Sequence, residues 1–187
     1  MREGSVRLAS KKTKMKTKKL LIVTLVLISG LFVKNAVAQN RGPSTPEERK
    51  RAVEIATLLE NDPFNKDAKK LTSELVFFLV QAPDIHVHLC SDVLGDYKKI
   101  KGDYSPIIVS QLTFSQGRFV IEHPEQADDW YQESMAGVEG VLRTYQNIKR
   151  AKPKVKISGL EELLAKQQAG QLADFVRTTL AGCTAKQ

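Results

Sequence analysis

The sequence predicts an all-α protein, a bundle or array of five to six helices. Three observations point to this class. Apolar residues recur three and four positions apart in several segments, capping residues stand before some of these segments, and proline or glycine stands after most of them. The connections are short, as in helical bundles. One segment at 84–90 alternates polar and apolar residues, which would suit a short extended piece.

The first 38 residues have the pattern of a secretory signal peptide. Eight basic residues precede an uncharged apolar run at 20–33, and Ala36 and Ala38 supply the small residues that a signal peptidase requires. Cleavage after Ala38 would leave 149 residues (187 − 38). The sequence leaves open whether translation starts at Met1 or at Met15. An uncleaved anchor is disfavoured, because a spanning helix needs about 20 apolar residues.

The formal net charge of +8 lies entirely within these 38 residues. They hold nine Lys and Arg against one acid, whereas residues 39–187 hold twenty of each. A mature chain without net charge lacks the broad positive field that nucleic-acid binding requires. We therefore expect a periplasmic or extracellular bacterial protein with no nucleic-acid partner. Contact with a membrane is expected only transiently, through the signal peptide.

A flexible tail at 39–45 is expected to lead into a single helical domain at 46–187. The first helix begins at Pro46, because Thr45 and Glu48 have the spacing of a capping box and proline is favoured in a first turn. One domain of this length can bury about two-thirds of the surface that its unfolded chain exposes.

A second helix is expected from about Lys66 to Ala82, capped by Asn65 and ended by Pro83. Residues 75–80 are all apolar (LVFFLV). Because a helix that is apolar on every side is normally buried, we expect the C-terminal half of this helix to be covered nearly all round.

The segment 107–123 fits two structures. As a hairpin it would turn at residues 115–118. As a helix it would have an ordinary length, bracketed by Pro106 and Pro124. We favour the helix, although short apolar runs are poorly resolved by pattern.

The clearest amphipathic helix is expected at residues 125–151. Three residues recur every seven positions and predict a buried stripe: Tyr131, Val138 and Tyr145. Acids stand in its first turn and bases in its last, as the helix dipole favours. Gly137 and Gly140 give the helix a narrow edge, which would admit a close helix neighbour inside the fold or across a homodimer.

Two shorter helices complete the prediction. One begins at Ser158, which together with Glu161 has the pattern of a second capping box, and ends at Gly170. The last helix runs from Leu172 to about Cys183.

Cys90 and Cys183 are the two cysteines of the chain. In an oxidising compartment two cysteines usually pair, so we expect a disulfide that ties the last helix to the middle of the fold. A free thiol pair and a metal ligand are the alternatives.

One segment carries residues of the types that bind metals. If residues 84–92 are extended, His86 and His88 project from one face about 6.5–7 Å apart, from where both could reach one ion. His123, Cys90 or an acid could supply a third ligand, and zinc or copper would suit these donors. We favour the simpler interpretation, a half-exposed linker with polar residues facing water, and we expect no cofactor.

His123 lies between Glu122 and Pro124, close to Asp128 and Asp129 in the sequence. A carboxylate–imidazole pair could serve as general acid and base in a hydrolase. The sequence contains no Gly-x-Ser-x-Gly, Gly-rich phosphate loop, His-Glu-x-x-His or Cys-x-x-Cys motif. We favour a helix junction with solvated acids and assign no catalytic residue.

Two features are candidates for contact with a partner. Trp130 lies about 100° from the buried stripe of its helix, and aromatic residues often anchor interfaces. Five bases fall within eight residues, at the end of that helix and in the linker after it. Three of them are contact candidates: Lys152, Lys154 and Lys156. They could bind an acidic protein or anionic lipid headgroups, although a solvated linker is the simpler interpretation.

These observations favour an exported, non-catalytic helical protein that binds, scaffolds or inhibits. Its expected partner is a protein, and a homodimer is one option. Metal binding through His86 and His88, and hydrolysis through His123 and its neighbouring acids, are the alternatives.

Overall fold

The computed structural model describes residues 41–96, 100, 102 and 104–184, and it confirms the all-α class. Six α-helices and no strand occur in this part of the chain: α2 (Pro46–Asn61), α3 (Ala68–Gln81), α4 (Tyr104–Glu122), α5 (Trp130–Ala151), α6 (Ser158–Gln168) and α7 (Leu172–Thr184). Two 3₁₀ turns, η2 (Ser91–Leu94) and η4 (Pro124–Gln126), join them. The predicted signal peptide at 1–38 and the first two residues of the predicted tail lie outside the described residues. Within the described ranges, no helix combines the length and the apolar character needed to cross a membrane.

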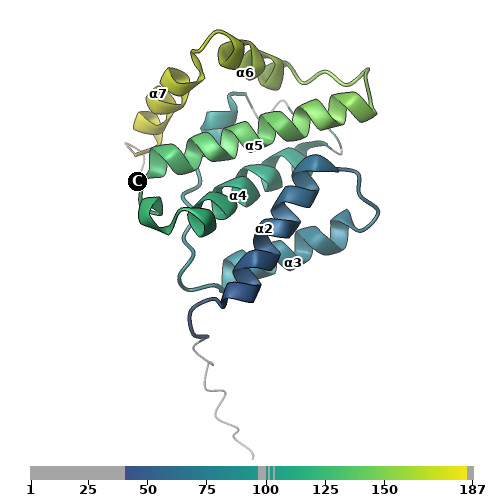
Figure 1. Ribbon diagram of the computed structural model, residues 1–187. Coiled ribbons are helices and arrows are strands. Elements are labelled where there is room, and N and C mark those ends of the chain that lie inside the picture. Colours follow the sequence, from purple (N-terminus) through teal and green to yellow (C-terminus); the bar gives the residue numbers. More distant parts are fainter. Residues whose placement is uncertain (1–40, 97–99, 101, 103, 185–187) are drawn as a thin grey trace, which may run out of the picture. The chain divides into compact units, whose positions relative to one another are not determined.

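An antiparallel pair, α4 and α5, lies at the centre, with α6 and α7 on one side and α2 and α3 on the other (Figure 1). The two helices approach closely because the narrow edge of α5 faces α4. A Cβ atom on Gly140 would lie 1.9 Å from Ser115 Oγ, and one on Gly137 would lie 2.7 Å from Gln116 Cγ. The close neighbour predicted from these glycines is therefore α4, inside the fold.

Residues 107–123 belong almost entirely to α4, so the favoured helix is confirmed and the hairpin alternative is wrong. Gly117, which the hairpin would have placed in a turn, serves a helix contact instead. A Cβ atom there would lie 2.8 Å from Leu79 Cδ2 of α3. The missing side chain lets α3 pack directly on α4.

The apolar core consists of two clusters that share α4. Ile108 and Leu112 point into the larger one, which α5, α6, α7 and η2 complete. Phe114 and Val120 point into the smaller one with α2 and α3. The buried stripe predicted for α5 is present at Val138 and Tyr145. Tyr131 is only partly buried and packs against the edge of the larger cluster.

The predicted start of α2 is confirmed, since Thr45 and Glu48 form a complete capping box. The start of α3 is displaced, because Asn65 does not cap it. Its Oδ1 accepts a hydrogen bond from the Asp67 N–H at 2.9 Å, which forms a turn before the helix begins at Ala68.

The expectation that the C-terminal half of α3 is buried nearly all round is wrong. Phe77 is 67% exposed, Val80 75% and Val76 43%. The cause is that α3 packs mainly on α2 and α4, which cover one side of it and leave the other to solvent.

The segment 84–90 forms no strand, and its alternation does not persist. Ile85 and Cys90 are buried although they were expected on opposite faces, and Leu89 is 60% exposed. The cause is the predicted disulfide, which is confirmed between Cys90 and Cys183 with a Cα–Cα distance of 6.2 Å. The bridge draws Cys90 into the larger cluster.

Two helix starts differ from the prediction. The helix expected from residue 125 begins at Trp130, after η4, and Asp129 caps it by accepting a hydrogen bond from the Gln132 N–H at 3.0 Å. At α6 no side chain caps the first turn, so the second capping box is wrong. Gly170 ends α6 as predicted, with a φ of +70° that glycine adopts without strain.

Candidate functional site

The residues proposed as metal ligands do not form a metal site. Cys90 is in the disulfide, so its thiolate is not available. Among the residues that the structure describes, no group of three His, Cys, Asp or Glu side chains is placed to hold an ion. Within this part of the chain His86 and His88 therefore share no third ligand, whether His123, Cys90 or an acid, and the donor set does not fit zinc or copper.

A buried carboxylate that the sequence did not reveal holds His88. Nδ1 of His88 lies 2.8 Å from Glu133 Oε2, and the backbone N–H of His88 donates to Glu133 Oε1 at 2.7 Å. Gln116 Nε2 donates to the carbonyl oxygen of His88 at 2.8 Å. One sequence signal could have found Glu133: it stands one turn before Gly137, on the edge of α5 that faces α4. These bonds fix the segment 84–90 on the central pair.

Burial raises the pKa of Glu133 above its ordinary value of 4.5, and the hydrogen bonds from His88 oppose this shift only in part. Between the ordinary pKa and the raised pKa, the folded protein holds a proton that the unfolded chain has lost. The contribution of Glu133 to stability is therefore largest at low pH and falls as the pH rises through that interval.

Replacing Glu133 with glutamine is expected to remove this pH dependence, since an amide does not titrate. Urea unfolding between about pH 4 and pH 7 should show that the wild type loses stability relative to Glu133→Gln as the pH rises above about 4.5. Glu162→Gln, which changes an exposed glutamate on α6, is the matched control and should run parallel to the wild type. If the stability of Glu133→Gln changed with pH in parallel with that of the wild type, the raised pKa of Glu133 would be contradicted.

His123 does not have the surroundings of a general base. Its ring is half exposed and packs on Phe119 with the centroids 4.9 Å apart, and its Nδ1 lies 3.7 Å from Glu125 Oε1. Asp129 is occupied as the cap of α5. We find no buried carboxylate against His123 in the described structure, so the hydrolase alternative gains no support.

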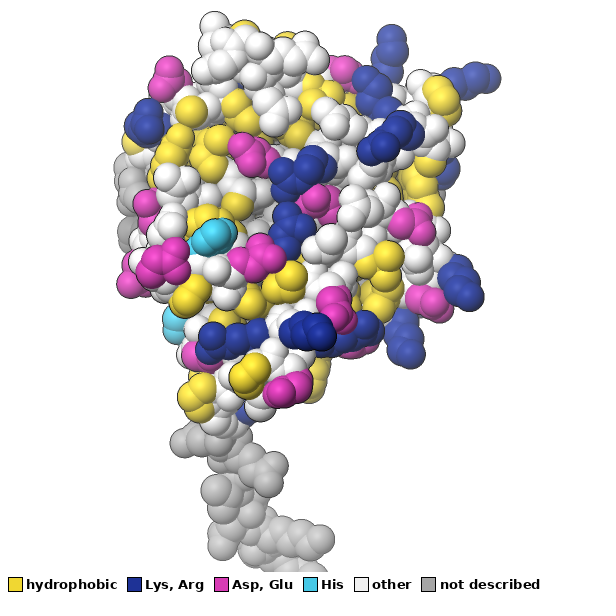
Figure 2. All heavy atoms as spheres, viewed as in Figure 1, with side chains coloured by type: hydrophobic (Ala, Val, Ile, Leu, Met, Phe, Trp, Pro, Cys, Tyr) yellow, Lys and Arg dark blue, Asp and Glu magenta, His cyan; other side chains and the backbone are white. Residues whose placement is uncertain are grey.

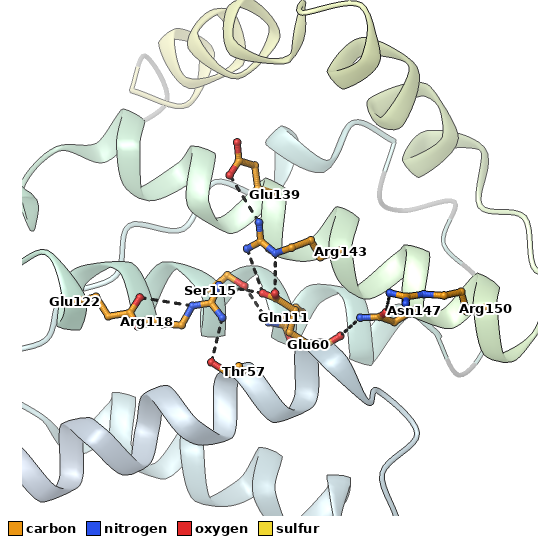
Figure 3. Close-up of polar contacts among 10 residues, drawn as sticks. All are labelled: Thr57, Glu60, Gln111, Ser115, Arg118, Glu122, Glu139, Arg143, Asn147 and Arg150. Atoms are coloured by element: carbon orange, nitrogen blue, oxygen red, sulfur yellow. Dashed lines mark hydrogen bonds and ion pairs between the residues drawn. The ribbon is translucent and has the colours of Figure 1, made fainter.

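A second buried carboxylate, Glu60, joins α2 to the central pair (Figure 3). Glu60 Oε1 accepts a hydrogen bond from Arg143 Nε at 2.7 Å, and Oε2 accepts one from Arg118 at 3.1 Å. Asn147 donates to the Glu60 carbonyl oxygen at 2.7 Å. A buried charge is tolerable when such partners satisfy it. Because the contacts lie between helices of this chain, we assign the Glu60 cluster a structural role.

The linker after α5 is fixed by Tyr145. Its hydroxyl donates to Glu161 Oε1 at 2.6 Å and accepts from the Ile157 N–H at 2.9 Å. Lys149 also donates to Glu161 Oε1, at 2.7 Å. Burial and the Glu161 hydrogen bond raise the pKa of Tyr145 to about 12, and Lys149 lowers the pKa of Glu161. Glu161 is thus bound by Tyr145 and Lys149 of α5, and for this reason its side chain does not cap α6.

Fixed in this way, the linker meets two aromatic rings from distant parts of the chain. Lys152 Nζ lies 4.1 Å from the ring centroid of Phe64 and 5.6 Å from that of Tyr104. The two rings pack edge to face, 6.4 Å apart. Exposed aromatic faces attract cations at such distances. The turn before α3, the start of α4 and the linker therefore meet at one end of the molecule.

A hollow of about 420 Å³ opens beside Tyr104. Lys154 and Lys156 line it together with Ile100, Val155, Ile157 and Ser158. We call the group Phe64, Tyr104, Lys152, Lys154 and Lys156 the basic–aromatic surface. The sequence indicated its three lysines but neither of its rings.

Trp130, the other contact candidate, is partly buried against the larger core cluster. Its ring centroid lies 5.8 Å from that of His88, and its Nε1 is buried without a hydrogen-bond partner. We therefore leave Trp130 out of the basic–aromatic surface.

Charges are separated along the central pair, although residues 39–187 together carry no formal net charge. The junction of α4 and α5 carries an acidic group: Glu122, Glu125, Asp128 and Asp129. The opposite end of the pair, about 28 Å away for a helix of 19 residues, carries the bases of residues 149–156. Figure 2 shows Lys and Arg side chains gathered where α5 ends and the linker begins.

Comparison with known proteins gives no relative: no protein family, no curated protein and no solved structure matches this chain.

Proposed function

We propose that this chain is an exported, non-catalytic binding protein that attaches to an acidic surface of another protein, in a scaffold or inhibitor role. The basic–aromatic surface carries this proposal, because it brings lysines and aromatic rings from three chain segments to one exposed end. Aromatic residues supply apolar contact area at interfaces, and complementary charge guides association and selects partners.

The surrounding structure supports a role in recognition. Tyr145 and Glu161 hold the linker in place, so Lys152, Lys154 and Lys156 lose less conformational freedom on binding than a free linker would. The separation of charge orients the molecule relative to an acidic partner, because the partner repels its acidic end and attracts its basic end. The disulfide agrees with an oxidising compartment, and export itself is inferred from the N-terminal sequence.

Reversing the linker charges is expected to abolish partner capture. A photo-reactive amino acid at position 154, in the protein expressed with its full N-terminal sequence, should cross-link to one discrete acidic protein. Adding Lys152→Glu and Lys156→Glu should remove that product, because both changes make the surface repel acids. With the identified partner purified, the same two changes should weaken binding at least tenfold and flatten its dependence on salt.

The matched control is Lys50 of α2, which is exposed and lies in the half of the fold that contains α3. A photo-reactive residue there should not yield the product, and Lys50→Glu should leave the affinity unchanged. Equal effects at Lys50 and at the linker would show that only net charge matters and would contradict the proposal. Binding to anionic vesicles that requires the three lysines, with no protein product, would replace the protein partner with a lipid surface.

A further inference from the structure

One face of α3 is left uncovered by the rest of the chain. Val76, Phe77 and Val80 are 43%, 67% and 75% exposed. Leu75 and Phe78, which are their neighbours in the sequence, are buried under α2 and α4. The helix is thus apolar on both sides, which is the pattern of a helix enclosed on both sides. An exposed apolar face of this kind indicates a contact that the isolated chain does not make.

The charges of α3 suggest what covers this face. Lys69 and Lys70 stand in its first turn, with Lys66 just before it, and its last turn holds no basic residue. This arrangement is the reverse of what the helix dipole favours, because the start of a helix is positive and its end negative. A neighbouring helix that ran antiparallel would correct both ends, since it would bring a negative helix end beside the lysines and lysines beside the negative end of α3.

The acids in and next to α3 do not remove the need for such a neighbouring helix. Glu74, the acid within α3, is bound by Arg51 of α2 at 2.8 Å. Asp67 precedes the helix, and its side chain makes no capping hydrogen bond. The outer face of α3 therefore has a basic half followed by an apolar half.

We propose that two copies of this chain pair through α3, antiparallel about a twofold axis between Val76 and Phe77. Such an interface is self-complementary, as a symmetric dimer requires. The apolar halves of the two helices cover each other, and the lysines of each copy lie near the C-terminal end of the other α3.

A groove beside α3 fits this arrangement. Helices α3 and α4 touch at Leu79 and Gly117, whereas toward their N-terminal ends a groove of about 310 Å³ separates them. Its apolar lining includes Leu59, Pro106, Ile107 and Phe114. Ser73 stands at its rim on the outer face of α3. With the axis between Val76 and Phe77, Val80 of the second copy lies opposite Ser73 and can enter the groove.

The size of α3 limits how strongly two copies of the chain are expected to associate. Fourteen residues make a helix about 21 Å long and about 10 Å wide. Its outer face is smaller than the roughly 800 Å² per partner of a standard interface. We therefore expect a weak dimer, whose population rises with protein concentration.

Analytical ultracentrifugation tests the pairing on the protein expressed with its full N-terminal sequence and purified as the cell processes it. The average mass should rise from monomer to dimer as the concentration increases. Phe77→Ser should weaken dimerisation at least tenfold, because it removes the most central apolar side chain. Leu89→Ser, which changes a comparably exposed leucine outside α3, is the matched control and should leave the association unchanged.

Cross-linking tests the orientation. The two native cysteines are bridged, so Phe77→Cys introduces a single free thiol near the proposed axis. Mild oxidation should convert this variant to a covalent dimer, whereas Leu89→Cys should stay monomeric. Because Phe77 is exposed, both of its variants should melt within a few degrees of the wild type, which separates lost pairing from lost folding.

A monomer at all concentrations, or a dimer that Phe77→Ser does not weaken, would overturn the proposal. So would a monomer that binds vesicles of phosphatidylglycerol through Phe77, since α3 would then face lipid. These outcomes leave the proposed function intact, because it depends on the linker lysines and not on Phe77.

Discussion

The variant Gly140→Ala is expected to lose about 3 kcal/mol of unfolding free energy, although the change from glycine to alanine ordinarily stabilises a helix. The new Cβ atom would stand 1.9 Å from Ser115 Oγ, 2.5 Å from Ser115 Cβ and 3.1 Å from Glu60 Oε2. Atoms cannot approach so closely, so α4 and α5 must move apart where the Glu60 cluster also binds them. Urea unfolding of the purified variant measures the loss.

Two further variants make this prediction specific. Gly182→Ala in α7 is the matched control, because a Cβ atom there meets nothing within 4 Å. It should be neutral or stabilising by up to about 1 kcal/mol, since alanine favours a helix more than glycine does. The double variant Gly140→Ala/Ser115→Gly removes the clashing side chain and should recover part of the lost stability, because a glycine in α4 and the lost hydrogen bond from Gln111 to Ser115 carry costs of their own. A Gly140→Ala variant as stable as the wild type would contradict the close packing of α4 on α5.

The double variant Cys90→Ser/Cys183→Ser is expected to show the second large effect. The bridge closes a span of 93 residues, for which the chain-entropy estimate is roughly 4–5 kcal/mol, an upper figure. We expect a loss of about 3 kcal/mol, because residual structure in the unfolded chain reduces such effects. Urea unfolding with and without a reductant measures it.

Reduction provides the control for this pair. The wild type should fall to the stability of the double variant when a phosphine reductant is added, and the double variant should not respond. On reduction the intact mass of the wild type should increase by the mass of two hydrogen atoms, because the S–S bond becomes two thiols. Two thiols that react with an alkylating agent before reduction would contradict the bridge.

The helices were predictable because they depend on local patterns. Thr45 and Glu48 mark the start of α2 within four residues of sequence, and Gly137 and Gly140 indicate a close neighbour without saying which helix it is. The disulfide followed from a composition of two cysteines and the inferred compartment. None of these inferences required knowledge of which helices pack together.

The remaining features depend on contacts between distant residues. A pattern shows that Phe77 is apolar but not that α2 and α4 leave it uncovered. Glu161 has the spacing of a capping residue, yet Tyr145 and Lys149 bind it instead. Glu133 lies 45 residues from His88, and Phe64 lies far from Lys152 in the sequence. Those pairings result from how α4 and α5 bring the rest of the chain together. The spacing of residues along one segment does not indicate such contacts.

The position of α4 between the two core clusters determines how the molecule comes apart. Ile108 and Leu112 belong to one cluster, and Phe114 and Val120 to the other. Neither cluster can dissolve without exposing a flank of the same helix. We therefore expect the two halves to unfold together in a single cooperative transition, with the amide hydrogens of α4 the last to exchange with solvent.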